Sequence, residues 1–208
     1  MIEESGFLIS GIVLGLAAGI SPGPLLALVF SETLKYGKKE GMKIAIAPLI
    51  TDPPIILFVF LILFNAAGYN FVIGAIALFG AGYLAYLGIL NLRAKSGVSE
   101  IPPAKRDALR QGITVNFLNP HPYLFWITIG GPIIFEALDI GIPAVIFFIL
   151  GFYSLLVGSK IAVALLVEKS KSFFGSRYYL SLLRVLGMIL ILFALILLRD
   201  GLNLIGIF

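Results

Sequence analysis

The residues of this sequence most suited to chemistry are polar side chains that interrupt long apolar stretches. They are Asp52, Asn116, Asn119, His121, Lys160 and Arg184. If these stretches cross a membrane, an ionisable residue within them indicates a functional site, because charge is costly at bilayer depth. A carboxyl group that alternates between buried and solvated surroundings takes up and releases a proton. We therefore expect Asp52 to bind the coupling ion, with structural pairing to a base or to freed backbone donors as the alternative.

Lys160 and Arg184 are the two basic candidates. Their long stems could lie in hydrocarbon while the charge reaches the interface, or both could face an interior cavity with Asp52. In the second case the cavity would carry a net positive charge, which suits a carboxylate or another anionic group. We assign Lys160 to the coupling-ion site and Arg184 to a packed interior face on the translocation path.

His121 and the two asparagines carry amide or imidazole groups near a pair of prolines. Histidine changes charge in the physiological pH range, so His121 is a candidate for proton transfer, with a structural hydrogen bond as the alternative. Asn116 and Asn119 lie one helical turn apart and share a face. Their amides could bind substrate or satisfy the carbonyl groups that Pro120 and Pro122 release.

Two proline motifs, Ser21-Pro22-Gly23-Pro24 and Asn119-Pro120-His121-Pro122, lie 98 positions apart in a chain of 208 residues, Pro22 matching Pro120. Proline removes a helical hydrogen bond and restricts the residue before it, so each motif should interrupt a helix. In a bilayer the freed backbone must face protein or a wet cavity. Matched interruptions in two halves of a chain indicate the substrate site of a transporter with inverted repeats. The predicted path comprises Ser21, Pro22, Gly23, Pro24, Asn116, Asn119, Pro120, His121, Pro122 and Arg184.

The composition is that of a membrane protein. Apolar residues make up 60% of the sequence and charged residues 12%, with a mean hydropathy of +1.07, whereas a soluble domain is about a quarter charged. A helix of roughly 20 apolar residues crosses the hydrocarbon core. The sequence therefore predicts an all-α protein with six transmembrane helices, the first and fourth broken at proline. The predicted spans are 6–33, 41–64, 69–92, 111–135, 142–167 and 178–199.

Two local features refine this picture. Asp52 directly precedes Pro53-Pro54, which predicts a further break halfway along the second span, facing the protein interior. Gly15-x-x-x-Gly19 has the small-residue spacing that lets membrane helices approach closely.

Basic residues fall on one predicted side of the membrane. Lys and Arg accumulate in short cytoplasmic loops, and twelve of the fifteen basic residues lie in or beside three connections that share a side. They are Lys35, Lys38, Lys39, Lys43, Arg93, Lys95, Lys105, Arg106, Arg110, Lys169, Lys171 and Arg177. Both termini are therefore predicted outside. Residues 1–208 form one transmembrane transporter domain, in which 1–92 is the first repeat, 93–110 a cytoplasmic linker and 111–208 the second. Because each repeat has three helices, the second is inverted.

Several motifs also occur in a combination that characterises one transporter family. They are Ser21-Pro22-Gly23-Pro24, Gly37-Lys38-Lys39-Glu40-Gly41, Asp52, Asn116-x-x-Asn119-Pro120 with Leu124-Phe125, and Arg184-x-x-Gly187. In these motifs the chain resembles the LysE/RhtB family of amino-acid exporters. The resemblance implies six helices, export of amino acids or related small metabolites from the cytoplasm, and coupling to an ion gradient. Leu25 and His121 stand where many members have Asp and Lys, so the resemblance names no particular amino acid.

The sequence therefore predicts a secondary active exporter in the cell membrane that works by alternating access. A metal-ion or other cation permease or channel is the alternative, because a lone Asp with Asn residues also suits a cation pathway. An enzyme or redox carrier is not favoured, since the sequence has no cysteine, no metal-ligand cluster and no Ser/His/Asp constellation. We expect no cofactor, no bound metal and no nucleic acid. The expected partners are a small solute, the lipid bilayer and H⁺ or Na⁺. The sequence is also compatible with a homo-oligomer.

Overall fold

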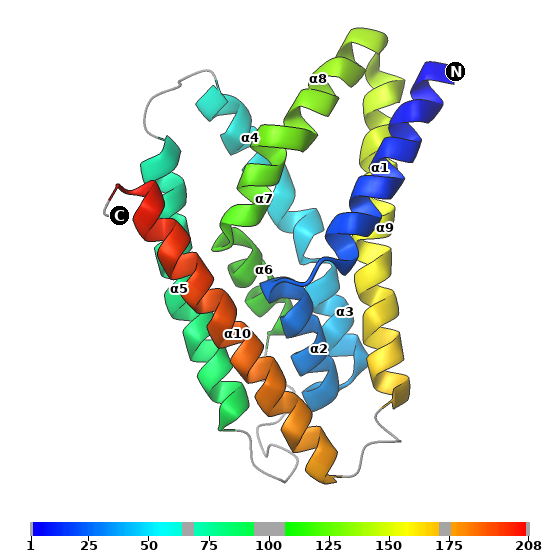
Figure 1. The fold of residues 1–208 in the computed structure, drawn as a ribbon. Coiled ribbons are helices and arrows are strands. Elements are labelled where there is room, and N and C mark those ends of the chain that lie inside the picture. Colours follow the sequence, from blue (N-terminus) through cyan, green and yellow to red (C-terminus); the bar gives the residue numbers. More distant parts are fainter. Residues whose placement is uncertain (1, 64–68, 94–106, 171–175, 207–208) are drawn as a thin grey trace.

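The computed structural model describes residues 2–63, 69–93, 107–170 and 176–206, and every regular element in these ranges is a helix (Figure 1). Most of the predicted 93–110 linker lies outside the described residues. The elements are α1 (Ile2–Ile20), α2 (Pro24–Tyr36), α3 (Lys38–Ala45), α4 (Ala47–Leu63), α5 (Tyr69–Leu92), α6 (Ala108–Phe117), α7 (Pro120–Phe125), the π-helical turn η2 (Trp126–Gly130), α8 (Gly131–Ile140), α9 (Ile142–Ser170) and α10 (Ser176–Leu204).

Five helical stretches in the described ranges are long and apolar enough to cross a membrane, and the α1–α2 pair makes a sixth if it counts as one bent span. The third predicted span, 69–92, has the bounds of α5, Tyr69–Leu92. Many outward-facing side chains are large and apolar; Phe79, for example, is 74% exposed. Such a surface suits lipid rather than water. The predicted all-helical membrane protein is confirmed at this level.

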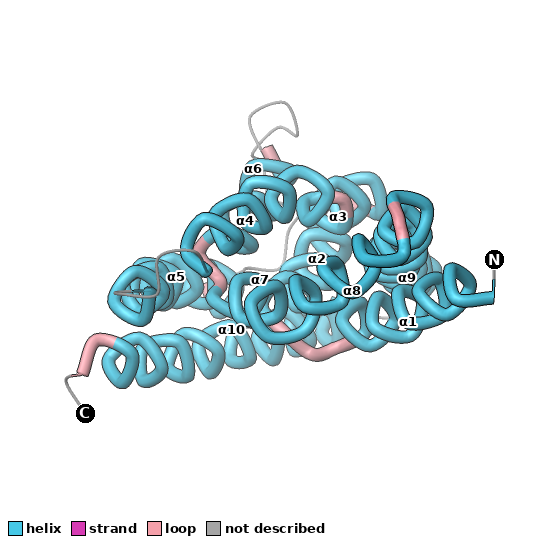
Figure 2. The backbone as a smooth tube through the Cα atoms, turned by 90° about the horizontal axis from the view of Figure 1, so that it is seen from above, coloured by secondary structure: helices cyan, strands magenta, loops and turns pink. Residues whose placement is uncertain are grey.

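Two long helix pairs form opposite ends of the molecule when it is viewed from above, α1 with α9 and α5 with α10 (Figure 2). Both pairs pack closely because glycines line the contact. A Cβ atom at Gly15 of α1 would lie 2.1 Å from the Phe152 carbonyl oxygen of α9. A Cβ atom at Gly187 of α10 would lie 2.8 Å from the Gly88 carbonyl oxygen of α5. Small residues allow such backbone approach between membrane helices.

The first proline motif breaks its span as predicted. α1 ends at Ile20 and α2 begins at Pro24, with a bend of 60° between them. Pro24 occupies the first position of α2, where a backbone N–H group would have no acceptor within the helix, so its absence in proline breaks no hydrogen bond. The chain therefore crosses from one half-helix to the next through Ser21, Pro22 and Gly23.

The second proline motif breaks its span earlier than predicted. α6 ends at Phe117, and Asn119 caps α7 by accepting a hydrogen bond from the His121 backbone N–H at 3.2 Å. Pro120 begins α7 and Pro122 lies in its first turn, so both prolines are helical. The unwound residues are Leu118 and Asn119, because proline is tolerated in the first turn of a helix but not in its interior.

The further break predicted at Pro53-Pro54 is wrong. α4 runs without interruption from Ala47 to Leu63, with both prolines inside it. Proline φ is compatible with the helix, but each proline removes one N–H donor and its ring crowds the carbonyl group four residues before it. Membrane helices tolerate such losses where neighbouring groups satisfy the freed carbonyls. Asp52 consequently lies on a continuous helix.

The start of α1 and the end of α10 lie toward the opposite end of the bundle from the ends of α2, α5 and α9. In Figure 1 the start of α1 and the end of α10 are in the upper half, whereas α2, α5 and α9 all end in the lower half. The lower end is called the linker end below, because α5 ends there and α6 begins there on either side of the predicted linker.

Candidate functional site

A cavity of about 240 Å³ lies where the two broken spans meet. It is lined by residues from α1 and the start of α2, from α4, from α6 through η2, from α9 and from α10. They are Ala18, Ser21, Pro22, Gly23, Pro24, Leu25, Leu26, Pro48, Asp52, Asn116, Asn119, His121, Pro122, Phe125, Trp126, Phe152, Leu156, Lys160 and Phe193. Ten of the twelve predicted path and coupling residues are therefore brought together around one space.

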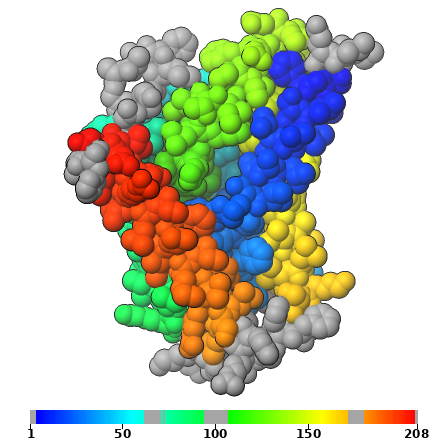
Figure 3. Space-filling view, viewed as in Figure 1, coloured from blue at the N-terminus to red at the C-terminus, as the bar shows by residue number. Residues whose placement is uncertain are grey.

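The cavity has an exposed rim and a buried wall. Ser21, Pro22 and His121 are exposed, whereas Asp52 and Lys160 are each only 4% exposed. Figure 3 shows the face of the molecule on which α1, α8 and α10 converge around the broken spans. The two charged side chains therefore belong to the protein interior.

Asp52 is held by hydrogen bonds from two other helices. Asn116 Nδ2 of α6 donates to Asp52 Oδ1 at 3.1 Å and to Thr51 Oγ1 at 2.6 Å. Tyr153 OH of α9 donates to Asp52 Oδ2 at 3.2 Å. A buried carboxylate needs such donors to offset the loss of water. Asn116 thus positions the candidate coupling residue and lines the cavity itself.

Lys160 replaces the hydrogen bonds that α1 loses at its break. Its Nζ donates to the carbonyl oxygens of Ala18 at 3.3 Å and Gly19 at 3.2 Å. In an unbroken helix these oxygens would accept from the N–H groups four residues on, but position 22 is proline and Gly23 has left the helix. A cation is also favoured at a helix C-terminus. Lys160 does not extend to the membrane surface, as one reading of the sequence allowed.

The second break is satisfied by other groups. Asn119 caps α7, and Tyr123 OH donates to the Phe117 carbonyl oxygen at 3.0 Å. Gly80 of α5 makes room for the Leu118 carbonyl group, since a Cβ at position 80 would lie 1.9 Å from its oxygen. Asn119 therefore acts as an acceptor for a backbone N–H group, and not as the donor to freed carbonyl groups that its structural reading suggested. Its side chain borders the cavity as well.

Two predicted path residues do not reach the cavity lining. Pro120 is buried at the start of α7 and is not among the lining residues. Arg184 is exposed on α10, so the expected packed interior face is not found, and its long side chain can reach the membrane interface. The cavity thus contains one lysine and no arginine.

The sequence did not single out several residues that shape the site. Tyr153 contacts Asp52 across 101 positions of sequence, and nothing local to Tyr153 indicates that contact. Trp126 is 1% exposed, lines the cavity, and packs edge-on against Phe152 with ring centroids 5.5 Å apart. Phe193 of α10 completes the apolar wall. Tyrosine and phenylalanine occur throughout the chain, so residue type alone does not identify Tyr153 or Phe193. Trp126 is the single tryptophan of the sequence and lies just after the second proline motif, and these are the only signals that mark it.

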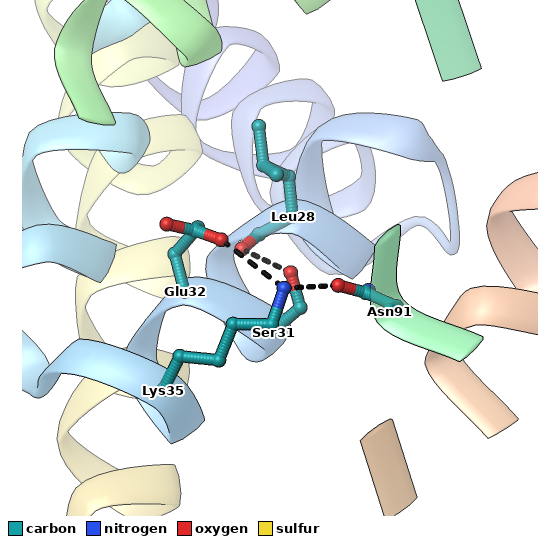
Figure 4. A network of polar contacts seen from close by, with 5 residues as sticks. All are labelled: Leu28, Ser31, Glu32, Lys35 and Asn91. Carbon is teal, nitrogen blue, oxygen red and sulfur yellow. Dashed lines mark hydrogen bonds and ion pairs between the residues drawn. The ribbon is translucent and has the colours of Figure 1, made fainter. Parts of the chain in front are cut away.

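A second buried polar cluster lies between α2 and α5 (Figure 4), both of which end at the linker end (Figure 1). Lys35 Nζ, in the last turn of α2, donates to Asn91 Oδ1 of α5 and pairs with Glu32 Oε1 at 3.5 Å. Ser31 Oγ donates to the Leu28 carbonyl oxygen. Glu32, Asn91 and Ser31 are buried. This cluster, called the α2–α5 latch below, joins the second half of the first broken span to α5.

The geometry is that of a multi-pass membrane protein, with broken spans around a cavity that carries one buried acid and one buried base. Residues 16–201 match the LysE type translocator family, and the chain belongs to that family. This is a family of transporters rather than of enzymes. Comparisons with curated proteins and with solved structures found no match.

Proposed function

We propose that this protein is a secondary active exporter of amino acids or related small metabolites in the cell membrane. Family membership supports transport of a small solute. The cavity volume of about 240 Å³ lies below the roughly 300–1,000 Å³ of pockets for drug-sized ligands, which suits a small metabolite. The observation that carries the proposal is that Asp52 and Lys160, both buried, line this cavity without forming a direct ion pair in the described part of the chain.

Coupling follows from competition for one carboxylate. A proton or Na⁺ bound at Asp52 neutralises the side chain, and a cationic group of the solute needs the same oxygens. A carrier that holds either the ion or the solute, but not both, exchanges them across the membrane when the cavity opens to each side in turn. Lys160 contributes by balancing the charge of ionised Asp52 within the low-dielectric cavity.

The proposed architecture is a pair of inverted three-helix repeats, residues 1–92 and 111–208, joined by the 93–110 linker with both termini outside. Three features support it. The two breaks border one cavity, the third helix of each half, α5 and α10, packs against its counterpart, and the start of α1 and the end of α10 lie toward the same end of the bundle (Figure 1). A pseudo-twofold axis in the membrane plane would bring equivalent segments together in this way.

Alternating access requires a contact that closes one side of the cavity. We assign this role to the α2–α5 latch, which ties α2 to α5 near the linker end (Figure 4). Asn91 Nδ2 is buried and has no hydrogen-bond partner among the described residues. An unsatisfied buried donor offsets part of the stabilisation by the latch. An arrangement in which α2 and α5 separate therefore costs less free energy than it would if every polar group of the latch were satisfied.

Counterflow in proteoliposomes tests the transport proposal. Vesicles loaded with an unlabelled amino acid should accumulate the same labelled amino acid transiently, because a carrier exchanges solute through one site. A flux that no unlabelled solute accelerates would indicate a channel and overturn the proposal. Imposed proton or sodium gradients in the same vesicles then identify the coupling ion.

A further inference from the structure

We propose that the substrate is a neutral α-amino acid with an apolar side chain, bound through its ammonium group at Asp52 and through its carboxylate at Lys160 and the start of α2. This inference rests on the proposed function and narrows its substrate class. It follows from the hydrogen-bonding capacity left at the two charged groups and from the character of the remaining wall.

Asp52 can accept a further hydrogen bond from a ligand. Its Oδ1 accepts from Asn116 and from Thr51, and its Oδ2 accepts from Tyr153. A carboxylate offers about four acceptor positions, so one position remains, on Oδ2. The side chain lines the cavity. An ammonium group is the complementary ligand, because a charge-assisted hydrogen bond to a buried carboxylate is stronger than a neutral one.

Lys160 and α2 together offer donors to an anion. Lys160 Nζ has three N–H groups and gives two of them to Ala18 and Gly19. The first turn of α2 also has N–H groups without intrahelical acceptors, Gly23 provides no side-chain cap, and Leu25 and Leu26 line the cavity. The helix N-terminus and the ammonium group therefore attract one carboxylate from two directions.

The same lining disfavours a charged substrate side chain. Asp52 is the only carboxylate among the lining residues, and Lys160 is the only lysine or arginine. Once both are engaged by the α-ammonium and α-carboxylate groups, a third substrate charge has no opposite charge on the buried wall. Burying such a charge without a partner is costly. Lysine-like and glutamate-like solutes should therefore bind poorly.

The rest of the buried wall is apolar and aromatic. The residues that face the cavity from α7, η2, α9 and α10 are Phe125, Trp126, Phe152, Leu156 and Phe193. Each methylene group that a substrate places against such a wall improves discrimination by roughly 10- to 200-fold. We therefore expect leucine to bind at least about tenfold more tightly than alanine.

Competition against labelled leucine in the counterflow assay tests the inference on the intact protein. Norleucine and lysine form a matched pair that differs by the terminal ammonium group. Norleucine should compete as leucine does, and lysine and glutamate at least about tenfold less well. 3-Methylbutan-1-amine lacks the carboxylate of leucine, and 4-methylpentanoate lacks its ammonium group. Each should therefore compete at least about tenfold less well than leucine. Equal competition by lysine, glutamate or either analogue overturns the inference.

A binding measurement separates this inference from the transport proposal. Isothermal titration of the purified protein with leucine should detect binding, and its absence overturns the inference whatever the transport assays give. If the protein exchanges other solutes in counterflow but does not exchange leucine, the proposed substrate class is wrong, whereas the proposal that the protein is a carrier is supported.

A variant pair tests the apolar wall. Phe193→Ala should reduce the preference for leucine over alanine several-fold, because Phe193 lines the cavity. Phe79→Ala serves as the control, since Phe79 is 74% exposed on α5 and does not line the cavity. If well-folded Phe193→Ala prefers leucine over alanine by the same factor as the unsubstituted protein does, Phe193 does not form part of the substrate-binding wall.

Discussion

Lys160 Nζ donates a hydrogen bond to the Gly19 carbonyl oxygen at 3.2 Å, although 141 positions separate the two residues in sequence. The contact joins α9 to the broken end of α1 and keeps a buried cation beside the cavity. One side chain therefore both satisfies the freed backbone and supplies the positive charge of the candidate site. A structural role and a binding role coincide at Lys160, and they can be separated by substitution.

Lys160→Met should destabilise the protein by about 1–3 kcal/mol, because two buried carbonyl groups lose their donor. Lys160→Arg keeps the charge and the donors and should be affected less. Thermal unfolding of the purified protein measures both. Lys39→Met, at an exposed position, is the control. Equal stability of Lys160→Met and Lys39→Met would show that the carbonyl contacts contribute little.

Asp52→Asn should abolish gradient-driven net export while exchange of solute survives, with weaker binding. The amide keeps an oxygen that can accept from Asn116 or Tyr153, but it cannot take up a proton. Reconstituted vesicles allow both activities to be measured across a pH range. Asp139→Asn, on an exposed part of α8, should leave both activities unchanged. Normal gradient-driven export by Asp52→Asn would favour the structural reading of this carboxylate.

The sequence predicts the two breaks and the buried acid because proline chemistry is local and charge within apolar segments is conspicuous. It does not predict which groups replace the lost hydrogen bonds. The bond from Lys160 to Gly19 depends on how α1 packs along α9, and the room at Gly80 depends on how α5 meets the second break. Both are tertiary contacts, for which neither chain segment carries a signal of its own.

Two expectations failed for physical reasons that the sequence leaves open. Pro53-Pro54 did not break α4, because the effect of proline depends on whether the surroundings tolerate two missing donors. Arg184 faces outward on α10. Apolar residues occur on all sides of a membrane helix, so the pattern gives little information about which face is interior. Lys160 occupies a comparable sequence context and faces inward.

Gly15→Ala should destabilise the protein by about 1–3 kcal/mol, since the added Cβ would lie 2.1 Å from the Phe152 carbonyl oxygen and push α1 from α9. Gly6→Ala is a matched control in the same helix, because a Cβ there meets nothing within 4 Å. It should be neutral or stabilising by up to about 1 kcal/mol. Thermal unfolding of the two variants decides the matter, and equal effects would contradict the close α1–α9 packing.

The proposed topology puts position 5 outside and position 99 inside. The chain has no cysteine, so single cysteines can be introduced without removing any native one. In intact cells Ser5→Cys should react with an impermeant thiol reagent, whereas Ser99→Cys should react only after the membrane is opened. The asymmetry of the basic residues gives the physical reason. Equal labelling of both positions in intact cells would rule this topology out.

The α2–α5 latch predicts which side of the cavity is closed. Lys35→Met removes the donor to Asn91 and the partner of Glu32, so it should favour opening toward the linker end. Ser21→Cys at the cavity rim reports this opening. In inside-out vesicles an impermeant thiol reagent should label Ser21→Cys several-fold faster in the Lys35→Met background. Lys38→Met, exposed at the start of α3, is the control and should leave the rate unchanged. A rate that is the same in all three backgrounds would mean that the latch does not control access to the cavity.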